Sequence, residues 1–137
     1  MNNTSLILLF EVGTKKLLFA GDAQIENWLY ALKTAPDSAQ VRELLADVAL
    51  YKVGHHGSLN ATPKTLWNLF QHKSEDPNFP DRLTTVMSTM AGKHGSSSRS
   101  TEVPREKLVS ALTNQSKHFS TQQLKGGTFY KDITIDI

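Results

Sequence analysis

Two short apolar runs in this chain end abruptly at a glycine that is followed by side chains able to bind a metal. Residues 16–20 end at the dipeptide Gly21-Asp22, and residues 48–53 end at the sequence G-H-H-G, which begins at Gly54. A helical pattern follows each turn. Strands that lead into helices bring ligand groups together at one edge of an α/β sheet. The repeated order of strand, glycine turn and helix therefore predicts an α/β protein in which the aspartate and the histidines share an edge.

The rest of the chain continues this alternation. Residues 5–12 are apolar on both sides of the pleat, which predicts a strand covered on both faces and within hairpin distance of residues 16–20. Further helices are expected at 23–32, from an N-cap at Asp37 or Ser38, at 63–70 and at 104–112, and further strands at 83–90 and, after a Gly126-Gly127 hairpin turn, in the tail to 137. The expected fold class is α/β, with a mixed sheet flanked by helices.

Length and composition predict one soluble domain, residues 1–137. Hydrophobic residues make up 39% of the 137, enough for a core, and the net charge of +2 without a basic run gives no indication of nucleic-acid binding. No cysteine is present, so any metal must use His, Asp, Glu or water. The sequence shows neither a spanning apolar segment nor a signal peptide, so we expect no membrane contact and a cytoplasmic location.

Both metal-competent turns also have a simpler interpretation. Asp22 would serve equally well as the cap of a helix that begins near Ala23. His55 and His56 would be equally suited to a solvated surface loop. The residues alone leave both interpretations open.

The polar residues after the histidine pair are expected to be structural. Asn60 and Thr62 suit the cap of a helix that begins at Pro63. Ser58 lacks the surrounding G-x-S-x-G pattern of a nucleophile, so it is expected to cap the chain or orient the histidines.

The remaining histidines are expected at the surface. His94 lies in a Gly/Ser-rich loop, 91–101, together with Lys93 and Arg99. That loop lacks the G-K-[ST] ending of a phosphate-binding loop, which favours a solvated loop. His72 and His118 lie in polar surroundings and are expected to be surface residues as well.

Three separated motifs resemble one known family. They are N-N-T-S-L-I-L-L-F-E-V from residue 2, L-L-F-A-G-D-A-Q from residue 17 and L-Y-K-V-G-H-H-G-S-L-N-A-T from residue 50. In this order they resemble the C-terminal half of metallo-β-lactamase-fold hydrolases, and most closely the hydrolase domain associated with competence DNA-uptake proteins. The resemblance covers residues 2 to about 70 and fades beyond residue 83.

The resemblance implies a fold and a site. It implies half of a four-layer αββα sandwich, whose two sheets hold two metal ions along a shared edge. Asp22 resembles the carboxylate that bridges the two metals, and His55 or His56 resembles the last histidine ligand. His56 is favoured because that ligand often directly precedes glycine in the family. The cofactor implied is zinc or another divalent transition metal.

The sequence departs from the family in one respect. The family's H-x-H-x-D-H signature, which supplies most ligands of the first metal, is absent, and no second histidine lies two residues from His72, His94 or His118. One aspartate and one or two histidines are fewer than the three or four protein ligands of ordinary zinc sites. A complete two-metal site therefore cannot come from one copy of this sequence.

Two hypotheses follow from this departure. The chain is either a non-catalytic, self-associating remnant of the fold, or a metal-dependent hydrolase whose missing ligands come from a second copy or from a partner chain that carries the N-terminal half. Half a sandwich leaves an apolar sheet face uncovered, and large exposed apolar patches usually mark interfaces. Both hypotheses therefore predict self-association, most simply as a two-fold dimer.

Overall fold

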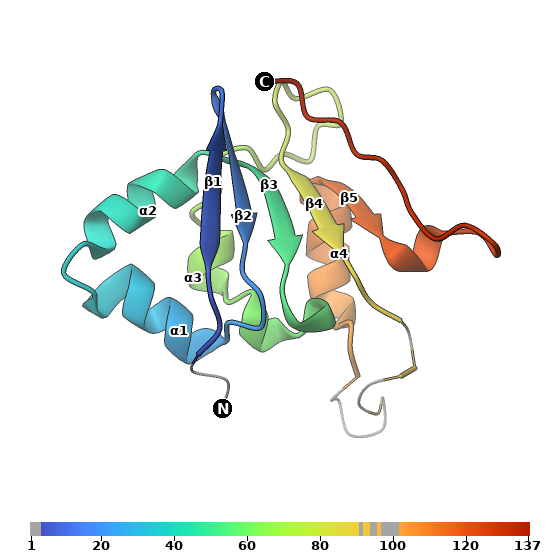
Figure 1. Ribbon diagram of the computed structural model, residues 1–137, viewed down its shortest axis with the longest axis horizontal. Coiled ribbons are helices and arrows are strands. Elements are labelled where there is room, and N and C mark those ends of the chain that lie inside the picture. The colour runs from blue at the N-terminus through green and yellow to red at the C-terminus, as the bar shows by residue number, and fades with distance from the viewer. Residues whose placement is uncertain (1–3, 91, 94–95, 97–101) are drawn as a thin grey trace.

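A five-stranded mixed sheet forms the centre of the protein (Figure 1). The computed structural model describes residues 4–90, 92–93, 96 and 102–137. The strands lie in the order of the sequence, and only β1 and β2 are antiparallel. Their bounds are β1 Leu8–Val12, β2 Lys15–Phe19, β3 Val48–Val53, β4 Thr84–Met87 and β5 Lys117–Ser120. The α/β fold class and the strand at 48–53 are confirmed.

Helices connect the parallel strands, as right-handed parallel crossovers require. Between β2 and β3 the chain forms α1, a π-helical turn and α2; α3 lies between β3 and β4, and α4 between β4 and β5. The bounds are α1 Ile25–Leu29, the π-helical turn Tyr30–Thr34, α2 Ser38–Ala46, α3 Lys64–Trp67 and α4 Glu106–Gln115. No helix in the described part of the chain is long and apolar enough to cross a membrane.

The hydrophobic core lies between the helices and one face of the sheet. Leu18, Tyr51 and Thr85 stand in register on neighbouring strands and point into this core, and all three are fully buried. The helices contribute the apolar side chains that cover them, Trp28, Leu45, Leu66, Leu108 and Leu112. Burial of this apolar surface is the main force that holds the two layers together.

The other face of the sheet has no helical cover, so the expectation that residues 5–12 are covered on both faces is wrong. Leu8, Phe10 and Val12 project from β1 onto this open face and are 45%, 49% and 41% exposed. Phe19 lies opposite Leu8 and packs edge-on against Phe10, with 5.6 Å between the ring centroids. An apolar sequence on both sides of the pleat does not by itself provide a layer on both sides of the sheet.

The C-terminal tail is not the strand that its alternation predicts. No strand follows β5 in the described chain, and the tail instead crosses part of the open face in extended form (Figure 1). Side chains of the tail, including Tyr130 and Ile133, line a hollow with Leu50 and Phe119 on that face. Residues 117–120 form the last strand because they follow α4 directly to the free edge of β4. Alternation makes a segment compatible with a strand, but it does not supply a strand partner.

Several helix ends differ from the expected ones. The first helix begins at Ile25 with Gln24 as its N-cap, so Asp22 does not cap it. The N-cap of α3 is Pro63, without a side-chain hydrogen bond, so Asn60 and Thr62 do not cap it either. The hydroxyl of Thr62 instead lies 2.8 Å from the hydroxyl of Tyr51. These short helices do not depend on such caps, because packing against the sheet provides most of their stability.

His118 is not the surface residue that its polar neighbours suggest. Its Nδ1 lies 2.9 Å from the Thr85 hydroxyl, which lies 2.6 Å from the Ser116 hydroxyl, and Ser116 donates to the Leu112 carbonyl. Because the proton of the Ser116 hydroxyl is used at Leu112, the Thr85 hydroxyl donates to Ser116. The Thr85 oxygen can then only accept from His118, so Nδ1–H of His118 is the donor. Nε2 is left buried, with no partner among the described residues. Burial lowers the pKa of His118 from its ordinary value, and a hydrogen bond to the backbone of Thr85 opposes that shift.

We therefore expect the protein to lose stability as the pH falls below the ordinary histidine pKa of 6.5. Between the lowered pKa and 6.5 the unfolded chain binds a proton at His118 that the folded chain does not, so the free energy of unfolding rises with pH in this window. Chemical denaturation of the wild type and of His118→Gln across this range checks it. The difference between the two should depend on pH, and parallel pH profiles would contradict the expectation.

Candidate functional site at the ends of the parallel strands

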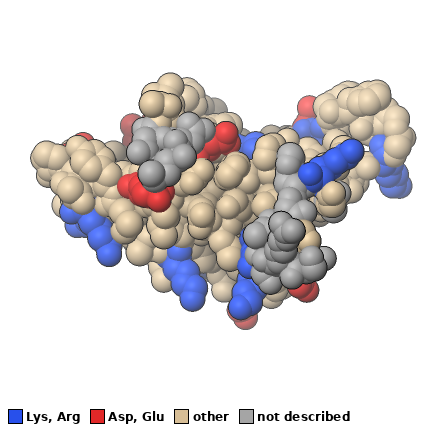
Figure 2. All heavy atoms as spheres, turned by 90° about the horizontal axis from the view of Figure 1, so that it is seen from below, with Lys and Arg blue, Asp and Glu red and all other residues tan. Residues whose placement is uncertain are grey.

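The two glycine turns lie side by side at one edge of the sheet. Phe19 pairs with Lys52 in the parallel β2–β3 ladder, so the turns that follow these strands leave the sheet at the same level. A Cβ atom on Gly54 would lie only 2.6 Å from the carbonyl oxygen of Gly21. Glycine is thus required at residue 54 for the two turns to approach this closely. Figure 2 looks onto this edge and shows charged residues of both signs around a largely uncharged surface.

Asp22 is held in its turn by its backbone. Its N–H donates to the Ser5 hydroxyl over 2.8 Å, and the residue is exposed. Burial lowers the pKa of Lys52, and the negative charge of Asp22 opposes that shift. Lys52 donates to the Val53 carbonyl over 3.2 Å. A cation held at Val53 therefore stands near the Asp22 carboxylate.

The two histidines occupy a strained turn. His55 and His56 both have positive φ, 42° and 54°, in the left-handed region that side chains with a Cβ rarely adopt. Gly57 follows with a φ of +87°, and the Arg105 N–H donates to its carbonyl over 3.1 Å. Such conformations persist only where the surroundings enforce them, and they concentrate at functional sites. Two consecutive histidines with a left-handed backbone conformation thus support a functional role for this turn, independently of the sequence motifs.

His56 is oriented in the way that a metal-binding histidine requires. Its Nδ1 lies 3.0 Å from the carbonyl oxygen of Ser88, at the end of the neighbouring strand β4. A carbonyl oxygen only accepts, so Nδ1 carries the proton and Nε2 carries the lone pair. Ligating histidines are commonly fixed by such a bond from their other nitrogen. This geometry suits His56 better than His55 for the role of ligand.

The residues at this edge fit a metal only in part. Within residues 4–90, 92–93, 96 and 102–137, no three His, Cys, Asp or Glu side chains are grouped so as to hold a metal ion. His72 is engaged elsewhere, since its Nε2 lies 3.0 Å from a carboxylate oxygen of Asp47, and His118 is engaged by Thr85. His94 and Arg99 fall outside the described residues. Asp22 and His56 alone are fewer than the three or four protein ligands of an ordinary zinc site.

An open hollow of about 690 Å³ adjoins His56. Ser88, Thr89, Lys93 and Phe129 contribute to its walls. The Thr89 hydroxyl is buried without a hydrogen-bond partner among the described residues. This hollow would admit a substrate beside the histidine. Sequence reasoning missed Ser88 and Thr89 because both fall inside the run 83–90, which reads as uninterrupted strand.

Comparisons with protein-family models, with curated proteins and with solved structures find no match to this chain. The resemblance to metallo-β-lactamase-fold hydrolases rests on the three sequence motifs alone.

Proposed function

We propose that this chain is a self-associating, non-catalytic relative of the C-terminal half of metallo-β-lactamase-fold hydrolases. The observation that supports this proposal is the open face of the sheet. Its apolar patch, Leu8, Phe10, Val12 and Phe19, lies over β1 and β2 and is at least 36% exposed at every side chain, although the C-terminal tail approaches it at Phe19 and at Gly13. In the αββα sandwich that the motifs imply, a second sheet would occupy this position.

A second copy of the same chain is the simplest cover. In a two-fold dimer the patch of one chain would pack against the identical patch of the other, so the contact is self-complementary. The patch itself carries no charge, which removes the like-charge repulsion that would oppose such a contact. Aromatic and branched aliphatic side chains of this kind supply most of the energy at interfaces.

Self-association is tested by sedimentation equilibrium at micromolar concentration. We expect a dimer for the wild type and a monomer for Phe10→Lys, because the substitution would place two charges in a dry interface. Phe79→Lys is the matched control, since Phe79 is a similarly exposed phenylalanine, 38% against 49%, on a surface loop. A monomeric wild type, or a Phe10→Lys protein that still dimerises, would contradict the proposal.

The alternative is a metal-dependent hydrolase that is complete only in an assembly. The Nδ1–H bond of His56 to Ser88 and the adjacent Asp22 turn favour it. A bound divalent cation would lower the pKa of its water to about 7 and supply hydroxide for hydrolysis. In such a site His56 would hold the metal through Nε2, and Asp22 would bind it through a carboxylate oxygen.

Zinc binding separates the two possibilities. Equilibrium dialysis of the purified dimer would give about one zinc per chain or more for the hydrolase, and zinc binding would be lost in His56→Gln. The non-catalytic relative would bind zinc no more tightly than His56→Gln does.

A further inference from the structure

A pocket lies on the other side of β1, between the strand and the helical layer. It consists of an inner hollow of about 250 Å³ and an outer hollow of about 470 Å³. Ile7 and Ala31 line both hollows, which therefore adjoin one another at these two residues. This site lies on the other side of β1 from the open sheet face, and Ser5 at its outer end accepts a hydrogen bond from the Asp22 N–H.

The inner hollow is lined almost entirely by apolar side chains. Besides the two shared residues its walls are Leu9, Leu18, Trp28, Val41, Leu44 and Leu45. Trp28 is the one of these with a polar side-chain atom, and its indole N–H is engaged by the Ala61 carbonyl at 3.0 Å. A ligand here would meet no free hydrogen-bonding side chain. A dry apolar cavity of about 150 Å³ already binds benzene, so this hollow has room for a larger apolar group.

The helical wall of the pocket has an unusual shape. The chain from Tyr30 to Thr34 is a π-helical turn, wider than an α-helical one. The Arg42 guanidinium donates to the Leu32 carbonyl and so satisfies a backbone group of this turn. Ala31, the smallest side chain of the wall, lies on the turn and lines both hollows. Single π-helical turns are rare and occur frequently at functional sites.

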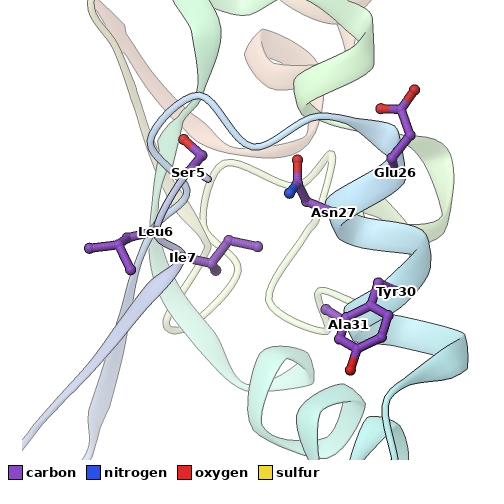
Figure 3. A pocket seen from close by; sticks show the side chains of 7 residues that line it. All are labelled: Ser5, Leu6, Ile7, Glu26, Asn27, Tyr30 and Ala31. Atoms are coloured by element: carbon purple, nitrogen blue, oxygen red, sulfur yellow. The ribbon is translucent and has the colours of Figure 1, made fainter. Parts of the chain in front are cut away.

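The outer hollow is polar at its rim (Figure 3). Ile7 and Asn27 point toward one another across it, Leu6 points away, and Glu26 extends from the helix at the rim. Glu26 carries the one charge among the described residues that line the hollow. Ser5, Asn27 and Tyr30 add neutral polar groups. The rim would therefore accept an uncharged or cationic group more readily than an anion.

We propose that this pocket binds a small single-chain amphiphile, with its alkyl or aryl part in the inner hollow and an alcohol or amine group at the rim. This choice of ligand follows from the two hollows. The inner one has apolar walls, and the outer one has neutral polar groups and one acidic group. This proposal does not depend on self-association or on a metal at the strand ends.

The test uses three compounds of equal chain length, 1-hexanol, hexylamine and hexanoate. NMR of the full chain follows the indole N–H signals of its two tryptophans during titration. We expect saturable shifts of the Trp28 signal with hexanol and hexylamine, and binding of hexanoate at least tenfold weaker. Trp67, which does not line the pocket, is the internal control. Absence of a saturable Trp28 shift with both hexanol and hexylamine would overturn the proposal.

Two variants locate the ligand. Ala31→Leu should weaken hexanol binding at least tenfold, because the larger side chain fills the junction of the two hollows, whereas Ala39→Leu on the exposed face of α2 should not. Glu26→Gln should reduce the preference for amine over carboxylate, because it removes the one charge at the rim. Equal hexanol affinity in Ala31→Leu and Ala39→Leu would place the ligand elsewhere.

Discussion

Replacing Gly57 by alanine is expected to destabilise the protein by about 2–5 kcal/mol. Two independent effects add up to this value. The backbone at Gly57 has a φ of +87°, where an L-residue costs about 1–2 kcal/mol. The new Cβ would also lie 2.6 Å from the Met87 sulfur and 2.8 Å from Pro104 Cβ, and overpacking of this kind costs about 1–3 kcal/mol.

Gly127→Ala is the matched control for the first effect. Gly127 has nearly the same φ, +84°, but nothing lies within 4 Å of the position that its Cβ would take. The free energy of unfolding, from chemical denaturation, should fall by about 1–2 kcal/mol in the control and by clearly more in Gly57→Ala. An equal loss of unfolding free energy in the two variants would contradict the prediction, because it would mean that Met87 and Pro104 move aside without an energetic penalty.

The same substitution should disturb the histidine turn. Gly57 follows His56 directly, and a backbone displaced by the clash would carry His56 away from Ser88. The expected result is loss of the hydrogen-bonded Nδ1–H signal of His56 in NMR spectra of Gly57→Ala, with that signal retained in Gly127→Ala. The absence of a side chain at residue 57 is thus needed for the hydrogen bond between His56 and Ser88.

The buried central strand β3 was predictable from the sequence. Residues 48–53 are continuously apolar apart from Lys52, and β3 occupies the same range. The adjacency of the Gly21 and Gly54 turns was also predictable, since parallel strands that lead into helices end at one edge. Local pattern and strand direction were sufficient for these features.

Features that depend on a distant partner were not predictable. The strand β5, with the sequence K-H-F-S, has no apolar run and exists because α4 delivers it to the free edge of β4. The tail has the better strand pattern but no strand partner. The bond from His56 to Ser88 depends on how β4 aligns with β3, which no local pattern specifies. Pairing between segments far apart in the sequence therefore determines which segment forms the last strand. It also determines the orientation of His56.

Trp28 is expected to be the most costly side chain to truncate. It is fully buried, and Phe or Trp to Ala substitutions in cores cost about 3–5 kcal/mol. Since small domains are stable by only about 5–15 kcal/mol, Trp28→Ala should leave a large part of the chain unfolded at 37 °C. Circular dichroism during thermal unfolding measures the effect.

Trp28→Phe separates the hydrogen bond from the packing. The indole N–H donates to the Ala61 carbonyl, whose other donor, the Tyr51 hydroxyl, is more distant at 3.3 Å. Loss of the indole therefore leaves a buried carbonyl poorly satisfied, at about 1–3 kcal/mol. The matched control is Trp67→Phe, because the indole of Trp67 donates to the side chain of Gln115, which can turn to water. We expect the smaller loss in Trp67→Phe, and the reverse order would contradict the argument.

The position of Trp28 gives this prediction a consequence for the site. Trp28 lies on α1, which follows the Gly21-Asp22 turn, and Ala61 ends the short helical turn that follows the histidines. The Trp28–Ala61 bond thus joins the segments that follow the two glycine turns. Trp28→Phe should therefore shift the NMR signals of Asp22 and His56 together, while Trp67→Phe should shift neither. Unchanged signals in Trp28→Phe would show that the close approach of Gly54 to Gly21 is sufficient to align the two turns.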